Sequence, residues 1–232
     1  MSQHDAATIR PVGSLDVTAR GAFIARTYVH LFGAIVVFTL IEVALFQSGA
    51  AQKIAETMLG TSWLLVLGGF MLVSWLATRS AMTSRSLPAQ YLALGAFILA
   101  EALIFIPLLW TAFLYAPGAI QSAAGVTLAG FTGLTAIAFW SRKDFSFMGS
   151  ILRWAGFAAL GLIVSSVLFG WNMGTWFSVG MVAFAGGAIL YDTSNVMRRY
   201  PEDRYVGAAL QLFASVALMF WYVLRIFLGS RN

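Results

Sequence analysis

Four ionisable side chains interrupt otherwise apolar stretches of this 232-residue sequence. They are Glu42, Glu101, Asp192 and Arg225. Placing such a group inside a membrane-spanning helix costs about 2.5–3.5 kcal/mol, so each marks a candidate path or switch for ions or protons until a structural partner is found. We therefore treat all four as candidate residues of an ion pathway or a pH sensor.

Asp192 opens the run Asp-Thr-Ser-Asn at positions 192–195. Carboxylate, hydroxyl and amide oxygens are the ligands that hard cations such as calcium prefer, so the run could receive a cation at a helix end. The alternative is a purely structural carboxylate, hydrogen-bonded to Thr193 or Ser194 or paired with Arg198 or Arg199 one to two turns away. The residues alone leave both interpretations open.

Glu42 and Glu101 occupy comparable positions in two different apolar runs. At a rise of 1.5 Å per residue, both lie about 20 Å from the same side, so they could share one depth near mid-membrane. Pro107 follows Glu101 by a turn and a half, where a proline frees a carbonyl and bends a helix. A structural role inside the bundle is the alternative for each residue, and also for Arg225.

The sequence does not assemble a catalytic site. An intramembrane aspartyl protease needs two facing aspartates, but all aspartates other than Asp192 fall in tails or loops: Asp5, Asp16, Asp144 and Asp203. A serine protease needs a buried serine–histidine pair, yet no Gly-x-Ser-x-Gly segment accompanies His30. There are no cysteines and only two histidines, too few for a zinc cluster. We expect no enzyme, no cofactor and no resident metal.

Composition determines the elements that must position these residues. Hydrophobic residues make up 60% of the chain and charged residues 10%, against roughly 25% charged in soluble domains. A spanning helix needs roughly 20 apolar residues, and seven such runs occur, at 28–49, 62–78, 88–110, 119–140, 151–170, 176–197 and 205–228. The sequence predicts an all-α polytopic membrane protein, with an N-terminal segment 1–27, a seven-helix domain 28–228 and a short tail 229–232.

Basic residues predict the orientation, because lysine and arginine accumulate on the cytoplasmic side of a membrane. Eleven of the fourteen flank alternate ends of the runs, on one side: Arg10, Arg20, Arg26, Arg79, Arg85, Arg142, Lys143, Arg153, Arg198, Arg199 and Arg204. The other three are Lys53, Arg225 and Arg231. We expect the N-terminus inside and the C-terminus outside, and no nucleic-acid partner, since no basic domain exists.

Three motifs resemble one known family. Gly-Phe-Thr-Gly-Leu-Thr at 130–135, with the loop Arg-Lys-Asp-Phe-Ser-Phe at 142–147, resembles the fourth helix and following loop of the Bax inhibitor-1 family. Gly-Ala-Ile-Leu-Tyr-Asp-Thr-Ser at 187–194 is similar to its sixth helix, and Leu-Gln-Leu at 210–212 with Leu-Arg at 224–225 is similar to its seventh. The match of helix number and order covers about residues 20–230, and it implies a bundle in which the last helix is central.

The resemblance also implies roles for residues. Family leak channels use two aspartates as a latch, one in the sixth helix and one in the seventh; Asp192 stands at the first position and Ser215 replaces the second acid. Arg225 matches a seventh-helix arginine. A family arginine that interacts with the latch has Arg79 as its nearest candidate here, although Ala77 is the strictly aligned position.

The resemblance therefore implies a bacterial inner-membrane protein with one of two functions. The first is a pH-sensitive calcium or cation leak channel, in which calcium is the transported ion. The alternative is a non-conducting regulator that binds a membrane protease or another stress-response membrane protein. In either case the lipid bilayer is the primary partner.

Overall fold

The computed structural model describes residues 10–141 and 143–229. Within these ranges the chain forms a 3-10 turn, η1 (Val12–Ser14), and eight helices: α1 (Val17–Gln47), α2 (Ala50–Leu59), α3 (Trp63–Thr83), α4 (Leu87–Tyr115), α5 (Ala119–Ser141), α6 (Met148–Phe169), α7 (Gly174–Arg198) and α8 (Tyr205–Gly229). Parts of several predictions fall outside the described residues: residues 1–9 of the N-terminal segment, including Asp5, tail residues 230–232, and Arg142 and Arg231 of the charge count.

Seven of these helices, all except α2, are long and apolar enough to cross a membrane. The prediction of an all-α polytopic membrane protein is confirmed. The helix α1 starts at Val17 rather than at residue 28, because Asp16 caps it by accepting a 2.9 Å hydrogen bond from the Ala19 N–H. With 31 residues it is about 46 Å long, longer than the roughly 30 Å hydrocarbon core.

The short helix α2 was not predicted from the sequence. Ala51 and Ala55, one turn apart, are fully buried against Ile106 of α4, while Gln52 and Glu56 hydrogen-bond to each other on the exposed face. Ten residues are too few to span a membrane. The apolar face of α2 consists of small side chains, which a search for long hydrophobic runs does not detect.

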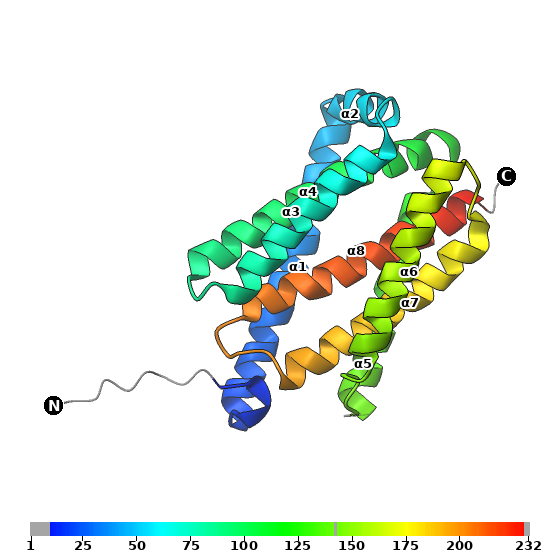
Figure 1. Cartoon of the computed structure of the whole chain (residues 1–232). Coiled ribbons are helices and arrows are strands. Elements are labelled where there is room, and N and C mark those ends of the chain that lie inside the picture. The colour runs from blue at the N-terminus through cyan, green and yellow to red at the C-terminus, as the bar shows by residue number, and fades with distance from the viewer. Residues whose placement is uncertain (1–9, 142, 230–232) are drawn as a thin grey trace.

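Helix α8 is the central element, as Figure 1 shows with the orange helix crossing the middle of the bundle. It packs against α1, α3, α4, α5 and α7. Gly207 makes one of these approaches possible, because a Cβ at this position would lie 2.9 Å from the carbonyl oxygen of Ala81 in α3. The expectation of a central last helix is confirmed.

The helices alternate in direction, so the connections gather at two ends of the bundle (Figure 1). The start of α1 and the α3–α4, α5–α6 and α7–α8 connections lie at what we call the N-terminal end. The helix α2 and the last turn of α8 lie at the other, which we call the α2 end. The described basic residues predicted on one side all belong to segments at or next to the N-terminal end.

Candidate functional site

Asp192 and Ser215 meet between α7 and the central helix α8. The Ser215 hydroxyl donates a 2.6 Å hydrogen bond to Asp192 Oδ2. Asp192 is 5% exposed and Ser215 is 7% exposed. The bond therefore joins two helices inside the protein, at the two positions that the family resemblance assigns to the latch.

The side-chain hydroxyls of the two residues that follow Asp192 accept hydrogen bonds from other parts of the protein. The Thr193 hydroxyl accepts a 3.5 Å hydrogen bond from the Tyr28 hydroxyl of α1. The Ser194 hydroxyl accepts one of 3.1 Å from the backbone N–H of Phe145 in the α5–α6 loop. Among the side-chain atoms of Thr193, Ser194 and Asn195, only Asn195 Oδ1 is buried without a hydrogen-bond partner. This arrangement favours the structural interpretation for Thr193 and Ser194.

Arg199 does not extend toward Asp192, which was one alternative from the sequence. It lies 3.4 Å from Asp144 of the α5–α6 loop and donates to the Ser146 hydroxyl. Hydrogen bonds from the Ser146 N–H and hydroxyl, with Arg199 nearby, hold the pKa of Asp144 below its ordinary value. Asp144 therefore stays ionised between pH 5 and 8, and this exposed contact adds no pH dependence in that range.

A segment at the start of the chain closes the N-terminal end beside Asp192. The Val12 N–H donates a 2.9 Å hydrogen bond to the Tyr200 carbonyl, and the Glu202 N–H donates one of 3.2 Å to the Arg10 carbonyl. Val12 and Tyr200 are both buried. Burial, with the nearby charge of Asp192, raises the pKa of Tyr200 well above its ordinary value, so this phenol stays neutral at physiological pH.

Arg204 and its neighbour Asp203, just before α8, form hydrogen bonds with α3 and α4 at the same end. The buried Arg204 guanidinium donates to the Met82 carbonyl at 3.1 Å and the Thr83 carbonyl at 3.3 Å, at the end of α3, and to Asp203 at 2.7 Å. Gln90 of α4 donates to the Asp203 carbonyl at 3.0 Å. Sequence reasoning counted Arg204 only as a topological charge, although Gln90, an amide inside an apolar run, was a signal of a buried polar cluster.

Glu101 and Arg225 line one cavity, of about 660 Å³, between α3, α4, α6, α7 and α8. Glu101 is buried at 6% exposure, and the Arg225 guanidinium lies 5.7 Å from the ring centre of Tyr222. The hydroxyl of Ser74, which also lines the cavity, is buried without a partner. The structure thus brings two of the predicted site residues together.

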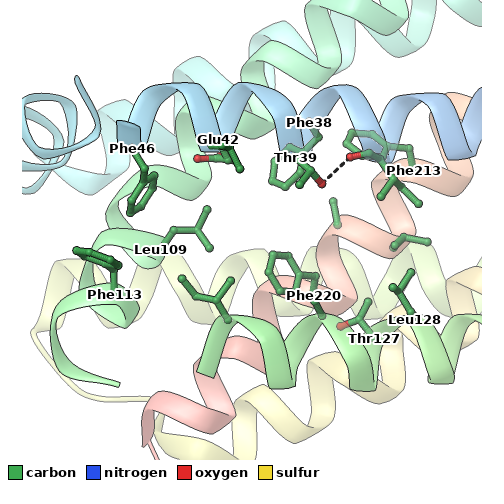
Figure 2. Close-up of a pocket in the computed structure, with 16 residues that line it drawn as sticks. Phe38, Thr39, Glu42, Phe46, Leu109, Phe113, Thr127, Leu128, Phe213 and Phe220 are labelled. Carbon is green, nitrogen blue, oxygen red and sulfur yellow. Dashed lines mark hydrogen bonds between the residues drawn. The ribbon is translucent and has the colours of Figure 1, made fainter. Parts of the chain in front are cut away.

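Glu42 lies in a different cavity, shown in Figure 2, which side chains of α1, α4, α5 and α8 line. The structure therefore does not bring Glu42 and Glu101 into one cavity. Phe38 contacts Phe105 at 5.3 Å between ring centres, and Phe46, one turn after Glu42, contacts Trp110 at 5.9 Å. Glu42 therefore lies beside the α4 segment between Phe105 and Trp110, and Glu101 lies nearer the N-terminal end of the bundle.

Arg79 lies outside the interior. It is exposed, and its guanidinium lies 5.2 Å from the ring centre of Trp75. Ala77, the strictly aligned position, is the residue of this turn that is buried in the core. The structure does not bring Arg79 to the Asp192–Ser215 pair, since its side chain packs on the outer face of α3.

Known proteins resemble the chain over much of its length. It is 30% identical to Bax inhibitor 1 of Schizosaccharomyces pombe over 224 residues, which cover 93% of this chain and 79% of that protein. It is 32% identical to Protein LIFEGUARD 4 of Arabidopsis thaliana over 60% of this chain and 58% of that protein. An uncharacterized protein of Pseudomonas aeruginosa is 33% identical over 47% of this chain and 49% of its own length.

A family model points the same way. The model described as inhibitor of apoptosis-promoting Bax1 matches residues 20–232. This range includes six of the seven long helices in full, α1 from its fourth residue onward, and both members of the Asp192–Ser215 pair. The chain is therefore a member of the Bax inhibitor-1 family of integral membrane proteins.

Proposed function

We propose that this protein forms a cation leak path through its helix bundle, with calcium as the transported ion, and that the Asp192–Ser215 contact closes it. The observation that carries the proposal is the buried 2.6 Å hydrogen bond between α7 and the central helix α8. A carboxylate between two helices gives a cation a binding partner once those helices separate. No cofactor is part of the proposal.

The cavity that contains Glu101 supplies the other half of the path. Ala214, the residue before Ser215, lines this cavity, and Arg225 lines it one turn from the end of α8. A cation that entered this cavity from the α2 end would pass Arg225 before it reached Glu101, and Ala214 borders the Asp192–Ser215 contact. The segment around Val12 and Tyr200 covers the opposite end.

The pH response of such a path depends on what surrounds Asp192. Its titratable neighbours are tyrosines, Tyr28 from α1 and Tyr200 from the α7–α8 loop, and Ser215 on α8 does not titrate. One carboxyl with a hydroxyl partner lacks the shared proton of a two-carboxyl site. We propose a pH response that is weaker than that of a two-aspartate latch, or one moved to more acidic pH.

Calcium-loaded liposomes containing the purified protein test the proposal. Conduction should give calcium efflux above that of empty liposomes, and Asp192→Asn should change this efflux. A flux equal to that of empty liposomes at every pH from acid to neutral would overturn the channel. The second candidate would then remain, a non-conducting regulator that binds a membrane protease, which the loss of the second acid at Ser215 favours.

We propose no catalytic role for the chain. Asp16 caps α1, and Asp144 and Asp203 lie in loops at the N-terminal end. Asp192 thus has a serine, rather than a second aspartate, as its hydrogen-bond partner. The paired carboxylates that a proteolytic centre needs are not brought together in the part of the chain that the structure describes.

We propose a cytoplasmic N-terminus in a bacterial inner membrane, because ten of the twelve described basic residues lie at or next to the N-terminal end of the bundle. A reporter fused after Asn232 should then be active only on the non-cytoplasmic side, since seven spans place the two termini on opposite sides. Cytoplasmic activity of that fusion would contradict this orientation.

Glu101→Gln should lower calcium flux several-fold while the protein still folds, because glutamine keeps the size of the side chain but removes its charge. Glu56→Gln, the same change on the exposed face of α2, is the matched control and should leave the flux unchanged. Equal flux in wild type and Glu101→Gln would assign Glu101 to structure.

A further inference from the structure

A second cavity, separate from the proposed ion path, lies between α1 and α5, with α4 and α8 as its floor (Figure 2). We call it the α1–α5 cavity. Its volume is about 340 Å³, within the range of about 300–1,000 Å³ that is usual for ligand sites. Val43, Phe113 and Leu128 line it and are 45%, 59% and 48% exposed. Its mouth therefore faces the lipid-exposed surface of the bundle.

The lining is apolar except for three side chains. The Thr39 hydroxyl is already used, because it donates a 2.8 Å hydrogen bond to the Ile35 carbonyl (Figure 2). Both carboxyl oxygens of Glu42 and the hydroxyl of Thr127 are buried without a hydrogen-bond partner. Glu42 is 7% exposed and Thr127 is 2% exposed, so their missing partner must come from inside the cavity.

The missing partner has a defined chemistry. A buried carboxylate is costly unless a positive group or several hydrogen-bond donors compensate it. None of the residues that line the cavity is basic, so the protein does not supply the charge there. An anionic ligand would be repelled by Glu42, and an uncharged hydrocarbon would leave three acceptor atoms unpaired.

We propose that the α1–α5 cavity binds a single-chain amphiphile with a protonated primary amine. The ammonium group donates hydrogen bonds to Glu42, and the alkyl chain lies against aromatic rings such as Phe38, Phe213 and Phe220, which lie between Glu42 and Thr127 (Figure 2). This site does not depend on the proposed conduction, because its lining residues, apart from Ala217, differ from those of the cavity that contains Glu101.

The position of Glu42 along α1 suits such a ligand. Five residues separate it from Gln47, the last residue of α1, which corresponds to about 7–8 Å. A cationic headgroup of a membrane amphiphile stays near the interface while its apolar chain reaches inward. The lining residue Ile35 lies two turns deeper on the same helix, so the cavity extends in the direction that the chain would take.

Binding of dodecylamine to the full-length protein in zwitterionic lipid nanodiscs tests the proposal, with empty nanodiscs as the measure of simple partitioning. We expect a saturable excess for dodecylamine, no excess for dodecanoic acid, and at least tenfold weaker binding of dodecyltrimethylammonium, which carries the charge without N–H donors. Absence of a saturable dodecylamine excess would overturn the proposal.

Variants locate the site. Glu42→Gln should weaken dodecylamine binding at least tenfold, whereas Glu56→Gln on α2 should bind as wild type does. Ala124→Phe fills the cavity from α5 without changing Glu42, and it should abolish the saturable binding of dodecylamine. This variant therefore tests the site even if Glu42→Gln does not fold. Wild-type affinity in Ala124→Phe would place the ligand elsewhere and overturn the site.

Discussion

Replacing Arg204 by methionine should lower the free energy of unfolding by about 3 kcal/mol. Removing one partner of a buried ion pair typically costs about 3–5 kcal/mol, and the lower value applies because the Asp203 side chain is 33% exposed. The change also leaves the Met82 and Thr83 carbonyls at the end of α3 without their donor. Thermal unfolding in detergent would measure it, as a fall in Tm of about 6–12 °C.

Arg85→Met is the matched control, since Arg85 is an exposed arginine in the α3–α4 connection at the same end. Its Tm should stay close to that of wild type. Arg204→Lys should fall in between, because lysine keeps the charge but cannot reach two carbonyls and a carboxylate at once. Equal Tm values for Arg204→Met and Arg85→Met would show that the Arg204 cluster does not stabilise the bundle.

Ser215→Asp should move the flux response of the protein toward neutral pH by about one unit or more. The Ser215 hydroxyl lies 2.6 Å from Asp192 Oδ2, so an aspartate at position 215 would place two carboxyl groups within hydrogen-bond distance. It costs free energy to ionise both of two adjacent carboxyl groups. The two groups therefore share one proton over a range of pH. Calcium flux from liposomes, measured from acid to neutral pH, would report the shift.

Ser215→Asn is the control, because it has the size of aspartate without its charge and should not move the response. Asp192→Asn combined with Ser215→Asp should remove the gain, since only one carboxyl then remains. If wild type already responds steeply near neutral pH and Ser215→Asp changes nothing, another acid is the sensor, and Glu101 is the leading candidate.

Much of the fold could be predicted because spanning helices carry a local signal. Length and apolarity alone locate the seven spans, and each of them is a helix in the structure. The start of α1 was missed because its first turns carry polar residues and depend on the Asp16 cap. The helix α2 was missed because its buried face is formed by small alanines.

Part of the site was also predictable, because the family motifs are local patterns in the sequence. The pairing of Asp192 with position 215 followed from family motifs, and the hydrogen bond between them is seen in the structure. The assignment of Glu42 and Glu101 to different cavities could not be obtained by counting residues, because it depends on which helices pack together across the bundle. The buried contacts of Arg204 join segments that are distant in sequence, which leaves no local pattern.

The contact between Val12 and Tyr200 also has a consequence for biosynthesis. These residues lie near opposite ends of the chain, and a ribosome produces the first long before the second. The N-terminal end therefore stays uncovered until six of the seven spans have been made. A stalled nascent chain that stops within α6 should leave residues 10–15 open to protease, and release of the complete chain should protect them.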